Sequence, residues 1–569
     1  MQLPRRIAIA RGEEPVDLLL ENGKLINVFS GEIHDVSVAI HEDRVVGFGQ
    51  YEARRTEDLG GRYVCPGLID GHLHLESSML SIPEFAGNVV TLGTTSVVAD
   101  PHEIANVLGL EGIRFVLDSS EGLPLRVFVM LPSCVPATPF ETSGATLCAA
   151  DLAQFKDHER VLGLAEVMNF PGVLFQDPDV LAKIEVFRNR VIDGHAPGLS
   201  GKDLAAYVSA GIGSDHECTV LDEAREKLRN GMRVMIRQGS AAQNLDALLP
   251  VVNEFNSRNC FFVTDDMDPR DIEERGHISG LVRMAIKKGM APIRAVQMAT
   301  IHAATYFRLR GLGAVLPGYL ADLLILDDLE QFKICRVYQN GRLVAEQGKL
   351  LVPSVSAASR VLPVSMNVNW DKVRDFIVSA SAESMNVIQV VRGQIVTRRV
   401  VERAAVLNGH AVADPARDLL KIAVIERHHG TGSYSVGFIR GFGLARGAMA
   451  CTVAHDSHNI IVVGASDGDM MVAARELAAL GGGMLVVDNA RVIAKLPLPI
   501  AGLMSDRPVA EVRSGLDAVT KAAQGLGCTL EAPFATLSFM ALTPIPELKI
   551  TDQGLFDSVN FRFVSLFAE

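Results

Sequence analysis

The sequence predicts an α/β protein built around a TIM-like (β/α)8 barrel, with a small β-domain and a C-terminal α+β domain attached to it. Between residues 65 and 311, short runs rich in β-branched residues alternate with helical stretches. The segments on either side of this range read as strands and turns, and residues 361–569 mix strands with helices. Strand–helix alternation of this length is typical of a parallel barrel.

Eight strands are expected in the barrel, separated by segments long enough to form helices. The expected strands are Leu68–His74, Thr95–Asp100, Arg126–Leu131, Leu162–Val167, Val191–His195, Gly211–Asp215, Arg233–Arg237 and Phe261–Asp265. A doubly wound parallel sheet is the rival architecture, but no Gly-x-Gly-x-x-Gly motif follows the first strand. The pattern therefore favours a barrel over residues 65–311.

The two segments that flank the barrel, residues 1–64 and 312–360, are expected to pair into one small, composite β-sandwich-like domain. Each contains short strands and one Asn-Gly pair, at Asn22-Gly23 and at Asn340-Gly341. An Asn-Gly pair between two strands is a strong signal for a two-residue hairpin turn. We therefore expect a hairpin at both positions.

Residues 361–569 are expected to form a third domain, with a linker over residues 353–370. Its length and position favour a lid or wall over the barrel mouth. One helix is predicted from Asp469 to Leu480, where three glycines end it. A second helix follows Asp506, and its predicted buried face carries Val512, Leu516, Val519 and Ala523.

The composition excludes several classes of function. The chain has 569 residues and a net charge of −13, without a Lys/Arg-rich block, which disfavours a nucleic-acid partner. No uncharged apolar run of membrane-spanning length is present, and the first residues do not resemble a secretory signal, so no membrane partner is expected. Eight scattered cysteines without a Cys-x-x-Cys pair favour reduced thiols in a cytoplasmic enzyme.

His72 and His74 close the first barrel strand and are the most informative pair of residues in the chain. Side chains two positions apart on a strand point to the same face, so both imidazoles are expected to point the same way. Imidazole is the commonest protein ligand of transition metals. A single His-x-His pair is nevertheless a weak signal, because solvated or core histidines are more frequent than ligands.

Polar residues at the ends of the other strands strengthen the metal interpretation. They are Asp100, Glu166, His195, His216 with Glu217, and Asp265. Because all strands of a parallel barrel end at the same face, these side chains are expected to converge there. Four histidines and two carboxylates suit two borderline divalent cations, with one carboxylate bridging them.

Each of these residues also has a purely structural interpretation. Asp100 alone fits a helix N-cap, and Glu166 alone fits a hydrogen-bonded core carboxylate. His102 and His277 are expected at the surface or behind the ligands. The histidines of the third domain are expected in loops or in the core, and these are His428, His429, His455 and His458.

These motifs together resemble the amidohydrolase superfamily and, within it, the bacterial adenine deaminases. The specific marks are the residues 70–78, 99–107, 166–169, 193–197, 214–217, 237–242 and 264–266. Hydantoinases and dihydroorotases in this superfamily use a carbamylated lysine on the fourth strand, where this chain has Glu166. The other nucleobase deaminase design requires a Pro-Cys-x-x-Cys motif, which is absent.

The resemblance implies hydrolysis of adenine to hypoxanthine and ammonia, for purine salvage, by a homodimer that holds two divalent ions per subunit. Mn²⁺ or Fe²⁺ is expected, with Zn²⁺ as a further option. In this hypothesis His72, His74 and Asp265 hold one ion, His195 and His216 hold the other, and Glu166 bridges them. Beyond the metal ligands, the resemblance implies a catalytic role for Glu103. It implies supporting or substrate-binding roles for Asp100, Glu217 and Ser240.

A hydroxide shared by the two ions would attack C6 of adenine. Asp265 is expected to accept the proton of the attacking water and then deliver it to the amine. Glu103, as a protonated donor, would stabilise the charge that develops at N1. Asp100, Glu217 and Ser240 would support the ligands or contact the substrate.

Two alternatives remain open at this point. One is an amidohydrolase that acts on another purine or on a cyclic amide. The more remote one is a non-catalytic binding module that kept the scaffold, which predicts at least one missing ligand. All six expected ligands are present in the sequence.

Overall fold

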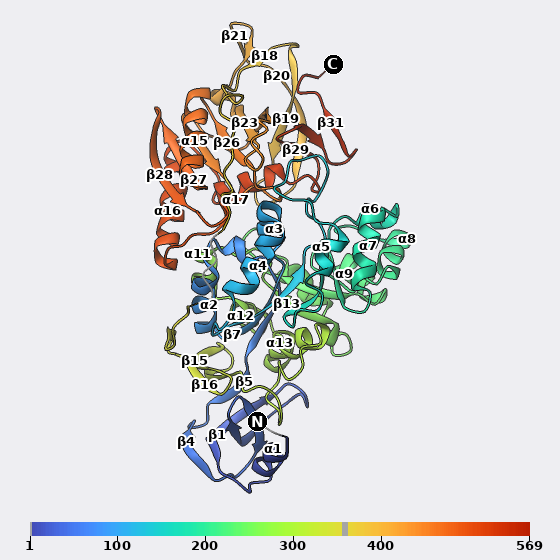
Figure 1. The fold of residues 1–569 in the computed structure, drawn as a ribbon, viewed down its shortest axis with the longest axis vertical. Helices are drawn as coiled ribbons and strands as arrows, with labels where there is room; N and C mark the ends of the chain where they lie inside the picture. Colours follow the sequence, from blue (N-terminus) through green and yellow to red (C-terminus); the bar gives the residue numbers. More distant parts are fainter. Residues whose placement is uncertain (1–2, 356–361, 569) are drawn as a thin grey trace.

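A computed structural model describes residues 3–355 and 362–568 of the chain. Three regions follow one another along the long axis of the molecule, with the barrel between an N-terminal sheet and a C-terminal sheet (Figure 1). The expected boundary between residues 360 and 361 lies outside the described residues, and the division into three domains stays a prediction. Among the described residues, no helix combines the length and hydropathy needed to cross a membrane.

A nine-stranded sheet joins the two segments that flank the barrel. β5 pairs antiparallel with β14, so that Cys65 lies opposite Leu324. Helix α1 (Leu3–Ala10) packs its buried Ile9 against this sheet. The strands are β1 (Val16–Asn27), β2 (Glu32–His41), β3 (Arg44–Phe48), β4 (Ala53–Asp58), β5 (Tyr63–Pro66), β14 (Leu323–Asp328), β15 (Lys333–Gln339), β16 (Arg342–Glu346) and β17 (Lys349–Leu350).

The two Asn-Gly pairs of this sheet behave differently. Asn340-Gly341 is the predicted hairpin turn between β15 and β16, with φ values of 50° and 71°. The hairpin predicted at Asn22-Gly23 is wrong, because both residues lie inside β1, where the register shifts between Leu20 and Gly23. Asn22 adopts a φ of 52° there and donates from Nδ2 to Asp58 Oδ1 at 3.0 Å, so the pair forms a bulge.

The barrel region has eight parallel strands, as expected. β6 to β10 form one sheet and β11 to β13 another, and backbone hydrogen bonds link them at both edges. Gly213 N donates to Ile192 O at 2.9 Å, and Asp265 N donates to His72 O at 3.0 Å. The strands are β6 (Leu68–Leu73), β7 (Thr94–Ala99), β8 (Arg126–Leu131), β9 (Val161–Val167), β10 (Val191–Gly194), β11 (Ser214–Asp215), β12 (Arg233–Arg237) and β13 (Cys260–Val263).

Two barrel strands end differently from their predictions. The strand expected from Gly211 begins only at Ser214, because Gly211 has a φ of 97° and belongs to the turn after α8. β13 ends at Val263, which leaves Asp265 in the following loop with a φ of 60°. The larger helices of this region are α2 (Ile82–Thr91), α3 (His102–Leu108), α4 (Leu110–Ser119), α7 (Pro178–Phe187), α8 (Gly201–Ser209), α9 (Leu221–Arg229), α11 (Pro269–Arg275), α12 (Ile278–Lys287), α13 (Pro292–Met298) and α14 (Ile301–Tyr306).

The C-terminal region is built on an eight-stranded sheet with helices on both faces. Alternate residues of β25 face opposite sides: Ala450 packs with the buried face of α15, and Met449 packs with that of α16. The sheet contains β19 (Ser384–Val390), β20 (Thr397–Arg403), β23 (Leu420–Ile425), β24 (Tyr434–Arg440), β25 (Ala448–Cys451), β26 (Ile460–Gly464), β27 (Gly483–Asp488) and β28 (Arg491–Pro497). The helices are α15 (Asp467–Ala479), α16 (Val509–Gly525) and the short α17 (Pro533–Ser538).

Both helices predicted in this region are confirmed. α15 begins two residues earlier than predicted, because the hydroxyl of Ser466 accepts the backbone N–H of Asp469 and caps the helix. It ends before Gly481, which has a φ of 79°. α16 buries the predicted face, including Val512 and Val519.

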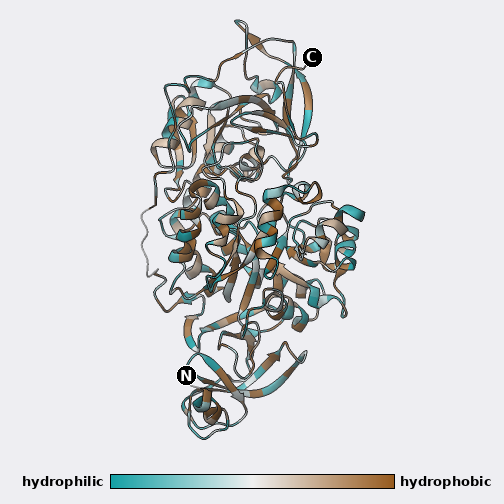
Figure 2. Ribbon diagram, turned by 45° about the vertical axis from the view of Figure 1, so that its right-hand side comes forward, coloured by the Kyte–Doolittle hydropathy of each residue, from teal (hydrophilic) through white to brown (hydrophobic). Residues whose placement is uncertain are grey.

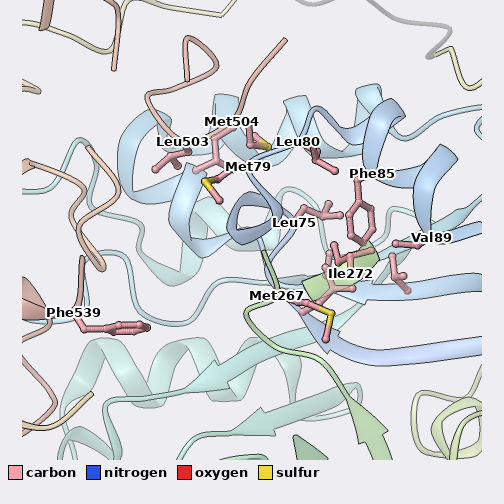
Figure 3. Close-up of a cluster of buried hydrophobic side chains, with 14 of the residues drawn as sticks. Leu75, Met79, Leu80, Phe85, Val89, Met267, Ile272, Leu503, Met504 and Phe539 are labelled. Carbon is pink, nitrogen blue, oxygen red and sulfur yellow. The ribbon is translucent and has the colours of Figure 1, made fainter. Parts of the chain in front are cut away.

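A hydrophobic contact holds the C-terminal region on the barrel. Leu503 and Met504 belong to the same buried cluster as Met79 and Leu80, which lie next to α2 (Figure 3). The backbone N–H of Ser505 donates to Met79 O at 2.8 Å. Figure 2 shows the strands inside the molecule mostly in brown and the outer helices with teal faces, so apolar burial continues from one region to the next.

Candidate metal centre

One cavity of about 630 Å³ lies where the barrel strands end, and the C-terminal region covers it. Its barrel side includes Glu166, His195 and Asp265. Its other side is formed by residues of the C-terminal region, including His455 and Phe539. A cavity of this size, lined by apolar groups and a few converging polar groups, is suited to a small-molecule ligand.

Glu166, the residue before the last in strand β9, lies between two sets of imidazoles. Its Oε2 atom is 2.7 Å from His195 Nδ1 and 3.1 Å from His216 Nε2. Its Oε1 atom is 3.5 Å from His74 Nε2 and also 3.5 Å from His102 Nδ1. Burial alone would raise the pKa of Glu166, but the charges of His195 and His216 outweigh it and lower this pKa well below its usual range. The carboxylate is therefore ionised and central.

His72 and His74 approach a second carboxylate, that of Asp265. The distances from His72 Nε2 and His74 Nε2 to Asp265 Oδ1 are 3.4 and 3.1 Å. The Nδ1 atom of His74 lies 3.0 Å from the carbonyl oxygen of Asp100, which can only accept a hydrogen bond. The proton of a neutral His74 therefore sits on Nδ1, and the lone pair on Nε2 is available to a metal.

Asp265 is also tied to an arginine. Arg237, the last residue of β12, donates from Nη1 to Asp265 Oδ2 at 2.6 Å and from Nη2 to Glu217 Oε2 at 3.0 Å. Burial would raise the pKa of Asp265, but the guanidinium of Arg237 lowers it well below its usual range. This arrangement turns Oδ1 of Asp265 toward the histidines.

The residues present fit a pair of divalent cations. Ligand atoms lie within 4.8 Å of one another in several overlapping groups, among them His72 with His216 and Asp265, and Glu166 with His195 and His216. His72 Nε2 is fully buried and has no hydrogen-bond partner among the described residues. A buried imidazole nitrogen without a hydrogen-bond partner, close to carboxylates, is suited to bind a metal ion.

All six predicted ligands meet at this centre, and the three accessory residues lie around it at different distances. Asp100 accepts the backbone N–H of His102 and faces its ring, and Glu217 pairs with Arg237. Ser240 lies farther out, where its hydroxyl accepts the N–H of Asp268 and its side chain lines a neighbouring cavity. Glu103 lines the central cavity.

The other histidines lie at different distances from the centre. Of the two positions expected for His102, the surface or behind the ligands, the structure has the second: the side chain is buried in the cavity wall, with Nδ1 3.1 Å from Asp100 Oδ2. His102 stays outside the ligand set that the sequence predicts. His455, expected in a loop or core of the third domain, lies in the cavity beside Glu103. His277 is buried behind β6 and bonds Thr94, so it does not reach the centre.

Two residues of the site, Arg237 and His455, were assigned no role there from the sequence, for different reasons. Arg237 had a visible signal, because a charged residue ends the apolar strand β12 at the barrel face where the ligands gather. His455 had none, since a loop of the C-terminal region reaches the barrel only through tertiary packing.

The chain is similar to known proteins over nearly its whole length. The sequence profile of the Amidohydrolase family matches residues 63–344, and that of the Adenine deaminase C-terminal domain matches residues 394–562. A protein named adenine deaminase from Desulfatibacillum aliphaticivorans is 49% identical over 563 residues, which is 99% of either chain.

Two further relatives carry the same name. The one from Oleidesulfovibrio alaskensis is 50% identical and covers 98% of each chain, and the one from Methanothrix thermoacetophila is 49% identical and covers 100% of each chain. The chain therefore belongs to the adenine deaminase family of the amidohydrolases.

Proposed function

We propose that the chain hydrolyses adenine to hypoxanthine and ammonia at a centre of two divalent metal ions. The observation that carries this proposal is the position of Glu166, an ionised carboxylate within 3.5 Å of imidazoles on both sides. Full-length similarity to proteins named adenine deaminase supports adenine as the substrate.

In this proposal His72, His74 and Asp265 would hold one ion, His195 and His216 would hold the other, and Glu166 would be shared between the two ions. Mn²⁺ or Fe²⁺ is the proposed metal, with Zn²⁺ as a further option, because imidazole and carboxylate ligands suit all three. When bound, such a pair of ions lowers the pKa of a water molecule and supplies hydroxide near neutral pH.

Asp265 is proposed to move the proton of the attacking water. Its Oδ1 atom faces His72 and His74, and Arg237 fixes its Oδ2 atom, so the carboxylate cannot rotate away. It accepts the proton of the attacking water and then delivers it to the amine that leaves from C6. Asp100 orients His74 through its carbonyl, and Glu217 holds Arg237 in place.

The first alternative is an amidohydrolase that acts on a modified purine or on a cyclic amide. Assays with adenine, N6-substituted adenines, hydantoin and dihydroorotate distinguish these substrates. The second alternative, a non-catalytic binding module, is disfavoured because all six proposed ligands point into one buried centre.

The decisive test is ammonia release from adenine by protein reconstituted with Mn²⁺, Fe²⁺ or Zn²⁺. The proposal expects turnover with at least one of these metals and none in the metal-free protein. Turnover of hydantoin or dihydroorotate without turnover of adenine would contradict the proposal and support the first alternative.

We also propose that the enzyme serves purine salvage in the cytoplasm as a homodimer, with a purine base as its small-molecule partner. Sedimentation of the purified protein tests the dimer. Growth of cells that depend on adenine as their only purine source tests the salvage role.

A further inference from the structure

His455 reaches the central cavity from the C-terminal region, opposite the proposed metal ligands. Its side chain lines this cavity and also a neighbouring one of about 640 Å³, and it stands between them with Phe539. The barrel alone therefore does not complete the wall of the site, because a loop between β25 and β26 contributes a polar ring.

The ring of His455 has a fixed orientation. It stacks on the ring of Phe539, with centroids 4.6 Å apart and an angle of 17° between the planes. The backbone N–H of His455 donates to Ser538 O at 3.1 Å. Stacking on a flat aromatic face holds the plane of the imidazole, and the side chain lines the cavity.

One nitrogen of this ring is engaged by the barrel. His455 Nδ1 lies 3.0 Å from Oε1 of Glu103, at the start of α3. Both carboxylate oxygens of Glu103 are buried, and neither accepts a well-aligned hydrogen bond from the described residues. Nδ1 is therefore the side of the imidazole that faces a buried carboxylate still in need of a donor, and Nε2 is left for a molecule in the cavity.

A third metal ion between Glu103, His455 and His458 is a weaker explanation, although their ligand atoms lie close enough. His458 Nδ1 accepts the backbone N–H of Ala454 at 3.2 Å. A neutral His458 therefore carries its proton on Nε2, which lies 3.9 Å from Glu103 Oε2. That nitrogen then carries a hydrogen, so it has no lone pair to offer a metal ion.

Resting on the proposed function, we infer that His455 is a catalytic residue supplied by the C-terminal region, whose Nε2 donates to N1 of the purine. Glu103 acts as its positioning residue. This differs from the expectation that a protonated Glu103 is the donor. Burial lowers the pKa of His455, but the Glu103 carboxylate raises it to about 9, which agrees with a charged donor.

Each proton and electron pair of the reaction has a donor and an acceptor. The oxygen of the nucleophile bonds to C6, the electron pair of the C6–N1 double bond moves to N1, and N1 takes the proton of His455 Nε2. As the C6–N bond to the amine breaks, Asp265 gives its proton to form ammonia. The C6 hydroxyl then loses its proton, which returns to His455, and hypoxanthine keeps the hydrogen at N1.

Two substitutions distinguish the role of His455 Nδ1 from that of His455 Nε2. In His455→Asn the amide reaches the position of Nδ1, which keeps a partner for Glu103 but removes the donor at Nε2. In His455→Gln the amide reaches the position of Nε2, which keeps a neutral donor toward the substrate. His429→Asn is the control, because it removes a contact of the C-terminal region to the barrel, with Ser143 O, outside the cavity.

With two ions bound in every protein, His455→Asn is expected to lower kcat on adenine by about 100-fold or more, the range of general acid catalysis. His455→Gln is expected to stay at least tenfold more active than His455→Asn, and His429→Asn to match the wild type. An active His455→Asn, within threefold of the wild type, would overturn the inference. So would a His455→Gln enzyme no better than His455→Asn.

Inhibition by two adenine analogues gives a test that does not depend on any variant folding. 1-Deazaadenine lacks the N1 acceptor, whereas 3-deazaadenine keeps it. The inference expects 1-deazaadenine to inhibit the wild type at least tenfold more weakly than 3-deazaadenine does. Equal inhibition by the two analogues would overturn it. An inert wild type with both ions bound would instead refute the proposed function, whatever the variants do.

Discussion

The Nδ1 atom of His74 lies 3.0 Å from the carbonyl oxygen of Asp100. This contact joins the ends of the first two barrel strands. A carbonyl has no proton to give, so this contact fixes the tautomer of the imidazole and turns its Nε2 atom toward Glu166 and Asp265. The hydrogen bond from a ligand's second nitrogen commonly orients metal sites in this way. The fold therefore fixes the orientation of His74 that its proposed role as a metal ligand requires.

Glu166→Ala should lose bound metal and turnover together. Removal of the central carboxylate leaves four imidazoles without the negative charge that they surround, and one bridge between the ions is lost. The expected loss of metal affinity exceeds the roughly 10–100-fold that changes around a metal ligand cause. Metal analysis after dialysis measures it, with Glu121→Gln, an exposed carboxylate, as the control. Two ions retained in Glu166→Ala would remove Glu166 from the bridge.

Asp265→Asn should keep the fold and lose about 100-fold or more of the turnover, because an amide cannot accept the proton of the attacking water. Asparagine tolerates the φ of 60° at this position, so the backbone is not strained by the change. Steady-state kinetics measure the loss, and Asp222→Asn, at an exposed position, is the matched control. Turnover within tenfold of the wild type would exclude Asp265 as the base.

Glu103→Gln should keep both metal ions and lose most of its turnover. The carboxylate lies next to His455 and outside the proposed ligand set, so metal content does not depend on it. A neutral amide no longer supports a charged His455. Metal analysis and kinetics on the same preparation test this prediction, and a rate within a few-fold of the wild type would contradict it.

The buried Lys549 side chain should make the free energy of unfolding depend on pH. It is fully buried and donates to the carbonyls of Ile395 and Phe539, two residues of the cavity wall, at 2.8 and 2.9 Å. Burial lowers its pKa from the ordinary 10.5 to about 7. Between these values the unfolded chain binds a proton that the folded chain does not, so this group makes stability rise with pH, by up to about 1.4 kcal/mol per unit.

Lys549→Met removes this pH-dependent term and leaves both carbonyls without a donor. The variant should therefore lose more stability, relative to the wild type, at pH 9 than at pH 7. Melting temperatures of both proteins at the two pH values measure the difference. An equal loss at both pH values would mean that Lys549 is not neutral in the folded protein.

The barrel strands and the meeting of the polar side chains at their ends could be predicted because both follow from local patterns. Parallel strands that end next to Glu166 and His216 must gather these side chains at one face, whatever the rest of the chain does. The apolar stretch before His72 likewise identified the first strand. The two helices of the C-terminal region were predicted from their capping residues and apolar faces.

Features that depend on long-range packing could not be predicted. The Asn22-Gly23 pair matches a hairpin turn locally, but a contact with Asp58 holds it as a bulge within one strand. His455 enters the cavity only because the C-terminal region packs on the barrel through Met504 and its neighbours. No periodicity in the sequence records such contacts.

A titration of metal-free protein with Mn²⁺, followed by ammonia release from adenine, tests the central claim most directly. The account predicts that turnover rises with loading and reaches its plateau at two ions per chain, and that Glu166→Ala reaches no such plateau. Protein that holds two ions per chain and releases no ammonia from adenine would contradict it.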